Sequence, residues 1–455
     1  MRKLEEELKK YAESGMYPFH MPGHKRRGGD EALKGAYACD ITEITGFDNL
    51  HDPQGILRGE MDFAARLFGA RETYFSVNGS TCACLAAISA AVPRGGTILI
   101  ERRCHISVYH AAYLRQLNVR YLEEPAFLAG GAKAEEMLAA ADAIVITSPS
   151  YEGEVKDVEA YAKMARAHGA VLIVDEAHGA HFSFHPYFPA SAIRKGADLV
   201  IQSLHKTLPV LTQGALLHNA SGAVRGEDLQ YFLDVYETSS PSYLLLMSMT
   251  RVIHQIAGEG SAYFDAYVAH LRSLRASLSG LLHLQLLPPG DAAETGRYDP
   301  GKILISTAGC SSGLSGEAFS GSMLSEWLRE AYRIESEMTL PEAVLFMTSP
   351  ADTDEGFARL LRALREIDAS LSGGGNCAGR VDLPADGSAL PPVRMTIAEA
   401  KDAPAERLPL AEAVGRVAAD FIIAYPPDVP VVVPGEVLTE EAAAHVDADA
   451  VKVVR

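Results

Sequence analysis

The stretch that decides the fold runs from residue 198 to residue 207, Asp-Leu-Val-Ile-Gln-Ser-Leu-His-Lys-Thr. Its first half is apolar and β-branched, which predicts a buried strand, and Lys206 follows that strand directly. Ser203 and His205 flank the lysine closely. Most lysines lie on solvated loops, but the apolar strand before this one and Thr207-Leu-Pro209 after it favour burial. A buried lysine at a strand end indicates a chemical role.

A second apolar run ends in an acid. Val171–Val174 leads straight into Asp175, which is followed by Glu-Ala-His-Gly-Ala-His181. An amine and a carboxylate at two strand ends suggest pyridoxal phosphate (PLP), which needs a lysine amine for its Schiff base and a carboxylate beside its ring nitrogen. We therefore expect Lys206 and Asp175 to fill these two roles.

A third strand end has the pattern of an anion site. Glu72–Val77 alternates like a strand and breaks at Asn78-Gly79-Ser80-Thr81, after which Cys82–Val92 is small and apolar enough for a packed helix. Backbone N–H groups and the helix dipole favour a phosphate there, and the hydroxyls of Ser80 and Thr81 can add hydrogen bonds. A hydroxyl before a helix is commonly only a cap, so this pattern alone is weak evidence for an anion site. The lysine and the carboxylate at the other two strand ends strengthen the interpretation.

Further candidates surround these strand ends. Ser203 and His205 can reach the phosphate, and His205 can also donate a proton. His105 follows another strand and can stack on the cofactor ring, with the small Ala177 on the opposite face. His178 can bond the ring hydroxyl oxygen. Each histidine alone is more often a structural residue.

Three histidine pairs lack a third ligand at familiar spacing, so we expect no metal site; they are His20/His24, His105/His110 and His178/His181.

Composition limits the classes of partner. The formal net charge of −18 argues against nucleic acid and anionic membrane and favours a cationic substrate. Six cysteines without paired spacing indicate a reducing compartment. The first residues form an amphipathic helical pattern unlike a signal peptide, and no apolar run reaches the roughly 18 residues of a membrane helix. We expect a cytoplasmic protein.

The 455 residues predict several domains in an α/β protein. Short β-branched runs alternate with helical stretches, which implies a mostly parallel sheet. The expected strands are Thr97–Ile100, Ala143–Ile146, Val171–Val174, Leu199–Ile201 and Ala215–Leu217, and the pattern restarts after about residue 285 with Lys302–Ser306 and Val344–Met347. Helices are expected at Ser240–Gly258, Ala262–Leu282, Met323–Tyr332 and Leu410–Ile423, and a strand at Val431–Val433. The expected boundaries are an N-terminal arm at 1–54, a large cofactor-binding domain at 55–285, a small α/β domain at 286–370, a linker at 371–392 and a C-terminal domain at 393–455.

These motifs, in this order, resemble those of the Orn/Lys/Arg decarboxylase family in its short form, over nearly the whole chain. The resemblance rests on Phe19–Lys25, Asp40–Glu43, Gly46–Asp48, Asn78–Thr81, Asp175–His181, Ser203–Lys206, Thr212-Gln213, Leu410–Arg416, Tyr425–Pro427 and Pro434–Glu436. It implies an aspartate-aminotransferase-like large domain and PLP-dependent decarboxylation of a basic amino acid. It also implies a homodimer, with Ser240 and Ser242 of one subunit near the phosphate of the other.

Three positions depart from the family pattern: Leu204, Thr250 and Asp428. The last two bear on substrate identity more than on reaction type. Arginine, lysine and ornithine differ only at the far end of the side chain, so the sequence does not separate them. We favour arginine, in polyamine synthesis, by family analogy.

The distal cation of the substrate needs a carboxylate, because a buried cation without a counter-charge is costly. We expect Glu436 in this role, with a solvated acid at a turn as the equal alternative. Two rival functions remain: an aminotransferase or other PLP lyase, because cofactor residues do not fix which bond breaks, and a catalytically silent regulatory homologue. Retention of Lys206 and Asp175 argues against the second.

Overall fold

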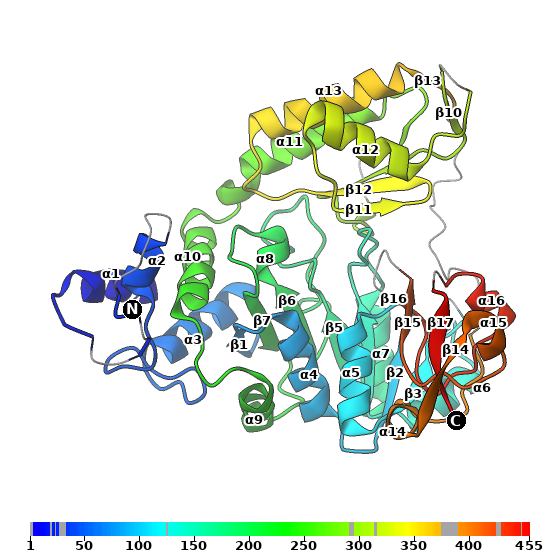
Figure 1. The fold of residues 1–455 in the computed structure, drawn as a ribbon. Helices are drawn as coiled ribbons and strands as arrows, with labels where there is room; N and C mark the ends of the chain where they lie inside the picture. Colours follow the sequence, from blue (N-terminus) through cyan, green and yellow to red (C-terminus); the bar gives the residue numbers. More distant parts are fainter. Residues whose placement is uncertain are drawn as a thin grey trace.

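The computed structural model describes residues 3–18, 21–22, 24–26, 33–123, 126–290, 295–313, 316–374, 390–424, 429–446 and 448–455. These residues form a large domain, a second domain reached through α10 and α11, and a C-terminal domain packed beside the large one (Figure 1). The expected fold class is confirmed. Most of the expected linker, at 375–389, and Asp428 lie outside the described residues.

The large domain is built on a seven-stranded sheet with the order β1-β7-β6-β5-β4-β2-β3. β7 runs antiparallel to both of its neighbours, and the other pairs are parallel. The expected runs all form strands, and β3 is an addition. The bounds are β1 Glu72–Ser76, β2 Thr97–Ile100, β3 Asn118–Tyr121, β4 Ala143–Thr147, β5 Val171–Asp175, β6 Leu199–Ser203 and β7 Ala215–Asn219.

Both faces of this sheet are buried. Along β5, Leu172 and Val174 enter one hydrophobic cluster, whereas Ile173 enters the cluster on the opposite face. Such a strand has no polar face, which explains its continuous apolar run. The helices of this domain are α4 Gly79–Ala91, α5 Ile106–Arg115, α6 Ala132–Ala139, α7 Val158–His168, α8 Leu204–Thr207 and α9 Gly226–Tyr236.

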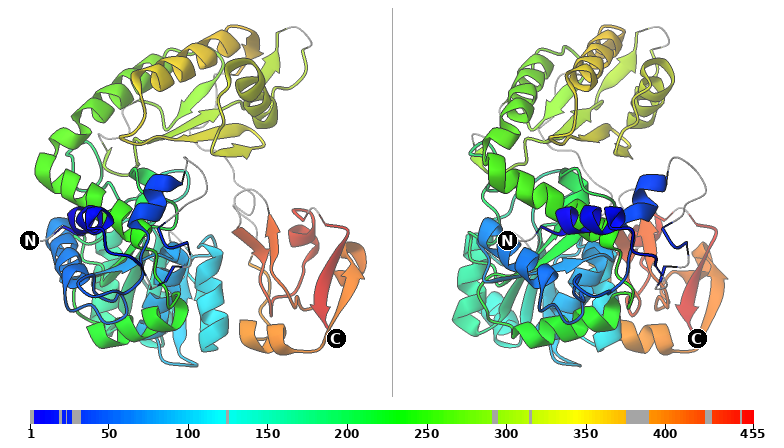
Figure 2. Two further views of the ribbon diagram at one scale, coloured as in Figure 1. Left: turned by 60° about the vertical axis from the view of Figure 1, so that its left-hand side comes forward. Right: turned by 90° about the vertical axis from the view of Figure 1, so that its left-hand side faces the viewer.

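The second domain has an antiparallel sheet of four strands in the order β11-β12-β9-β8. α11 and α13 pack on each other, and both lie in this domain (Figure 2). The helix α10 Tyr243–Glu259 connects the large domain to this one (Figure 1). The elements of the second domain are α11 Ala262–Leu278, β8 Gln285–Leu287, β9 Lys302–Ser306, α12 Gly321–Tyr332, β11 Met338–Leu340, β12 Ala343–Met347 and α13 Asp354–Asp368, with the pair β10 Cys310–Ser312 and β13 Leu371–Gly373 beside them.

One expectation about the C-terminal domain is wrong. Leu410–Ile423 is not one helix, because the helix α15 ends at Ala413 and Gly415 then adopts a φ of 85°. The following amides of Ala418 and Ala419 bond to carbonyls of other segments, so this stretch joins β-structure. The elements are α14 Ile397–Asp402, β14 Ala405–Pro409, α15 Leu410–Ala413, β15 Ile422–Ala424, β16 Val429–Val432, α16 Glu440–Ala443 and β17 Ala450–Val454.

The N-terminal arm contains α1 Leu4–Glu13 and α2 Lys34–Cys39. α1 packs against α10 and against α3 Ile56–Phe68, which is the first helix of the large domain. Asp48 organises the entry to α3: its carboxylate accepts hydrogen bonds from the amides of Gly55 (2.7 Å) and Leu57 (3.0 Å), among others. Tyr243 of α10 donates to the carbonyl of Asp48 at 2.8 Å. No helix in the described ranges combines the length and apolar character needed to cross a bilayer.

We expect Asp48→Ala to lower the free energy of unfolding by about 1–2 kcal/mol at pH 7, because the first turn of α3 loses its acceptor. Burial opposes ionisation of Asp48, but its backbone hydrogen bonds prevail and lower its pKa. The stabilisation is therefore present above the unfolded-state pKa and is lost as the pH falls through the folded-state pKa.

Urea unfolding at pH 7 and at pH 3 measures this difference. Asp62→Ala is the matched control, since Asp62 pairs with Arg58 on the exposed face of the same helix and contributes at most about 0.5 kcal/mol. Equal effects of the two substitutions would contradict the capping role.

Candidate active site

Lys206 lies at the carboxyl edge of the large sheet. β6 ends at Ser203, and the short helix α8 then carries Lys206. The lysine Nζ lies 3.1 Å from Nε2 of His178. Burial lowers the pKa of Lys206, although the charges of Asp175 and Glu337 oppose the change. A depressed pKa leaves more of the nucleophilic neutral amine at neutral pH.

Asp175 is the last residue of β5 and is only 7% exposed. β5 and β6 are adjacent and parallel, with Asp175 in register with Ile201, so their carboxyl ends meet at one edge of the sheet. The Asp175 carboxylate accepts a hydrogen bond from the amide of Ala177 at 3.1 Å. The structure thus brings the expected acid and amine into one site.

The turn before α4 is the third strand end at this edge. Gly79 takes a φ of 77°, which a side chain would strain, and its amide bonds the carbonyl of Gln213 at 3.0 Å. Asn78 stands at the helix N-cap without a side-chain capping bond. Ser80 is half-buried and Thr81 is exposed. A 13-residue helix with this open first turn can bind an anion.

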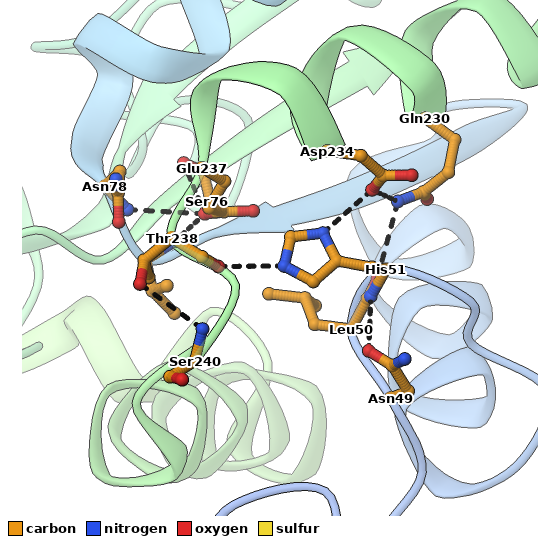
Figure 3. Close-up of polar contacts among 11 residues, drawn as sticks. Asn49, Leu50, His51, Ser76, Asn78, Gln230, Asp234, Glu237, Thr238 and Ser240 are labelled. Atoms are coloured by element: carbon orange, nitrogen blue, oxygen red, sulfur yellow. Dashed lines mark hydrogen bonds and ion pairs between the residues drawn. The ribbon is translucent and has the colours of Figure 1, made fainter.

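Glu237 stabilises this turn through hydrogen bonds (Figure 3). Its carboxylate accepts hydrogen bonds from the amides of Val77 at 2.5 Å and Asn78 at 3.3 Å and from the Ser76 hydroxyl at 3.1 Å. Burial raises the pKa of Glu237 despite these donors. Sequence reasoning missed this residue, because nothing local relates residue 237 to a turn about 160 positions earlier.

His51 holds the segment that follows Glu237 (Figure 3). Its Nε2 lies 2.8 Å from the carbonyl of Thr238, and its Nδ1 lies 2.8 Å from Asp234. The amide of Ser240 donates to the Thr238 hydroxyl at 3.3 Å. The N-terminal arm therefore fixes the path of Thr238–Ser240. His51 also escaped sequence analysis, although it lies three residues after the family-like Asp48.

The two expected serines have different surroundings. Ser242 caps α10, where its hydroxyl accepts from the amide of Leu245 at 3.5 Å. Ser240 is exposed beside it. A contact of either serine with a second subunit stays a prediction.

The three site histidines are held in different ways. His105 caps α5 and keeps an exposed ring, with Nδ1 accepting from the Ser107 amide at 3.2 Å. His205 turns its Nδ1 to the carbonyl of Gly214 at 3.1 Å. His178 is buried, and next to it Ala177 is buried as well.

Two buried hydroxyls provide a test of whether a cofactor fits here. Ser203 Oγ and Thr207 Oγ1 are buried and have no hydrogen-bond partner among the described residues. Buried polar atoms are seldom left unpaired, so these two, on either side of Lys206, fit acceptors that a bound group would supply.

Within the described ranges, no three His, Cys, Asp or Glu side chains gather closely enough to hold a metal ion.

Glu436 has a different place from the one expected. It is fully buried and forms a two-pronged ion pair with Arg102, with Oε1–Nη1 and Oε2–Nη2 distances of 2.6 and 2.9 Å. Tyr121 donates to the same carboxylate at 3.0 Å. Its charge is therefore used within the chain, where it joins the C-terminal domain to the large domain. The carboxylate for a distal cation has to be sought elsewhere.

Lys302 is a further residue that sequence reasoning passed over. It begins β9 of the second domain, is 1% exposed, and places Nζ 2.8 Å from Nδ1 of His178. The available signal resembled that for Lys206, namely a lysine next to an apolar run, although Lys302 stands at the start of its run and Lys206 follows the end of its own. Only the packing of the two domains brings the two lysines onto one imidazole.

Comparisons with known proteins give two matching family models. Residues 3–287 match the family model described as Orn/Lys/Arg decarboxylase, major domain, and residues 388–448 match its C-terminal domain. The arginine decarboxylase of Bacillus subtilis is 31% identical over 96% of this chain and 91% of its own.

Solved structures show the same fold. The constitutive lysine decarboxylase of E. coli aligns with a TM-score of 0.76 at 22% identity, covering 96% of this chain and 76% of that one. A structure named SPT with PLP aligns with a TM-score of 0.51 at 13% identity, covering 69% of this chain and 76% of that one.

We expect Glu436→Ala to lower the free energy of unfolding by roughly 3–5 kcal/mol, because it leaves the Arg102 guanidinium buried without its counter-charge. Thermal and urea unfolding measure the loss. Glu227→Ala is the control, since Glu227 pairs with Arg225 where both side chains are about 70% exposed, and its effect should stay below about 1 kcal/mol. A stable Glu436→Ala protein with a raised KM would return Glu436 to the substrate site.

Proposed function

The chain belongs to the Orn/Lys/Arg decarboxylase family and is an amino acid decarboxylase; from this premise we propose that it removes the α-carboxylate of arginine with PLP held at Lys206. One observation carries the proposal. The Lys206 amine contacts His178 at 3.1 Å beside the buried Asp175, where the carboxyl ends of two parallel strands meet.

The residues of this edge suit each part of PLP. Lys206 supplies the amine for attachment, and the first turn of α4 with Ser80 supplies donors for the phosphate. The unpaired hydroxyls of Ser203 and Thr207 supply two more groups on the same side. His105, whose ring is exposed at the start of α5, can cover one face of the ring. When bound, PLP supplies an electron sink for the pair of electrons released with CO2.

The chain's own groups then have defined tasks. Asp175 holds a proton at the ring nitrogen, because a buried carboxylate favours a positive partner. Lys206 would hold PLP through its amine, and the same amine, once free, would deliver a proton to the carbon that loses the carboxylate. His205 is the second proton donor within the same helix, with its Nδ1 fixed by the carbonyl of Gly214.

Arginine is favoured over lysine and ornithine by the relatives. The relative at 31% identity over nearly the whole chain is an arginine decarboxylase, whereas the constitutive lysine decarboxylase of E. coli is 25% identical. The net charge of −18 suits any of the three cationic substrates and does not rank them. A role in polyamine synthesis, a homodimer and a cytoplasmic location stay predictions.

The rival enzyme function is transfer of the amino group, which would use the same lysine and carboxylate. Family membership and the C-terminal domain favour loss of the carboxylate. The products separate the two, because decarboxylation yields an amine and CO2, whereas transamination yields a keto acid.

We expect the purified protein with added PLP to convert arginine to its amine at a higher kcat/KM than lysine or ornithine. Mass spectrometry of the products over the three amino acids measures this preference. Borohydride reduction followed by peptide mapping should place the cofactor on Lys206. Labelling of Lys25 or Lys195 instead would remove Lys206 from the proposal, and a keto-acid product would replace decarboxylation by transamination.

We expect Asp175→Ala to lower turnover by a hundredfold or more while PLP binding is partly retained, because the ring nitrogen loses the carboxylate that keeps it protonated. Steady-state kinetics with saturating PLP and the bound-cofactor absorbance give the two readouts. Asp265→Ala, which removes an exposed carboxylate of α11, is the control. Near-normal turnover in folded Asp175→Ala would contradict the role of Asp175.

A further inference from the structure

Glu337 is an accessible carboxylate at the junction of the second domain with the large domain. It comes directly before β11, which lies on the side of the second domain that faces the large domain (Figure 1). Its backbone amide donates to the carbonyl of Leu345 at 3.0 Å, so the neighbouring strand β12 fixes its position. The residue itself is exposed. The second sheet therefore presents a fixed negative charge toward the large domain.

Tyr151, in the loop after β4, connects Glu337 to the candidate active site. Its hydroxyl donates to Oε1 of Glu337, and its ring centre lies 4.7 Å from that of His178. The His178 imidazole lies 3.1 Å from Nζ of Lys206. The Tyr151 ring also packs against the apolar cluster that contains Met338, the residue after Glu337. A tyrosine and a histidine in contact thus lead from the carboxylate to the lysine.

The charge of Glu337 also acts on Lys206. Together with Asp175, it opposes the lowering of the lysine pKa by burial. Coulombic effects of this kind weaken with distance, which agrees with the contacts through Tyr151. An extended arginine side chain places its guanidinium carbon about 6 Å from its α-carbon. A substrate whose α-amino group lies at Lys206 can therefore extend its distal cation past the tyrosine to Glu337.

Other carboxylates at this junction already have partners. Glu152 pairs with Arg103 at 3.0 Å, and the buried Asp299 hydrogen-bonds His181 at 3.2 Å. Among the residues that the structure describes, Glu337 forms no ion pair, and its hydrogen bond from the tyrosine hydroxyl uses Oε1 alone. Oε2 is therefore available to a cation from outside the chain.

Lys302 is the competing cation within the chain. The charge of Glu337 acts on this lysine as well. However, Lys302 is only 1% exposed, and its Nζ lies 2.8 Å from Nδ1 of His178. A lysine held inside the junction in this way leaves the exposed carboxylate without a paired counter-ion.

We propose that Glu337 is a specificity-determining residue that binds the distal cation of the substrate, with Tyr151 orienting its carboxylate. The inference rests on the proposed function, because it takes the substrate to be a basic amino acid placed at Lys206. It assigns to the second domain the counter-charge that Glu436 does not supply, since Glu436 is paired with Arg102.

A pair of amines that differ only in distal charge tests the proposal. Guanidinobutylamine is the amine that arginine yields on loss of CO2, and ureidobutylamine is its neutral counterpart. Calorimetric titration of the PLP-loaded protein measures the affinity for each. Glu337→Gln should weaken guanidinobutylamine about tenfold, because a hydrogen bond to a charged group becomes a neutral one. The affinity for ureidobutylamine should change little, since that amine has no distal charge to lose.

Two further variants control for structural effects. Glu335→Gln removes an exposed carboxylate two residues earlier and should leave both affinities unchanged. Glu337→Asp keeps the charge and should restore part of the preference for guanidinobutylamine. The absorbance of bound PLP should be the same in all variants. Equal weakening of both amines by Glu337→Gln, or no weakening of either, would overturn the proposal and leave Glu337 as a solvated acid.

The binding readout separates this proposal from the proposed function. Neither amine has a carboxylate to lose, so the titration does not depend on the reaction. A loss of preference for guanidinobutylamine in Glu337→Gln, without release of CO2 from arginine by the unaltered protein, would retain the role of Glu337 and reject the proposed reaction. An unchanged preference in an active arginine decarboxylase would do the reverse. In that active enzyme, Glu337→Gln should raise KM for arginine more than it lowers kcat.

Discussion

The structure depends on keeping ionisable groups buried at one edge of a sheet whose two faces are both apolar. Removing a charge from water is costly unless a partner or a neutral state relieves it. At the ends of β5 and β6 the chain solves this by placing Asp175, His178 and Lys206 within mutual reach. The depressed pKa of Lys206 is thus a consequence of where the fold puts it.

This constraint also joins the domains. The second domain contributes Lys302 to the imidazole of His178, so the orientation of its antiparallel sheet sets the surroundings of Lys206. The C-terminal domain is fastened by the Arg102–Glu436 ion pair, and its helix α14 packs on α5, whose N-cap is His105. The N-terminal arm fixes Thr238–Ser240 through His51. Each peripheral part therefore contacts a segment that carries a candidate site residue.

The comparison of Glu436 with Lys302 shows why local reasoning fails for charged residues. Both are charged residues next to apolar runs, and the sequence offers the same signal for each. Glu436 meets a guanidinium from a residue over 300 positions away, which satisfies its charge inside the chain. Lys302 meets the imidazole of His178 at the sheet edge that carries Lys206. Which charge is satisfied and which is available depends on contacts that no local pattern records.

The sequence by itself determined the strands, the fold class and the residues at the strand ends, because apolar runs, glycine turns and the residues that follow them are local features. β2 and β9 have the expected bounds, and the large sheet is mostly parallel. Tertiary structure alone decided the antiparallel β7, the loss of helix after Ala413, the pairing of Glu436, and the meeting of Lys206 and Lys302 on His178. The physical reason is that these outcomes depend on desolvation and hydrogen bonds between segments far apart in the chain.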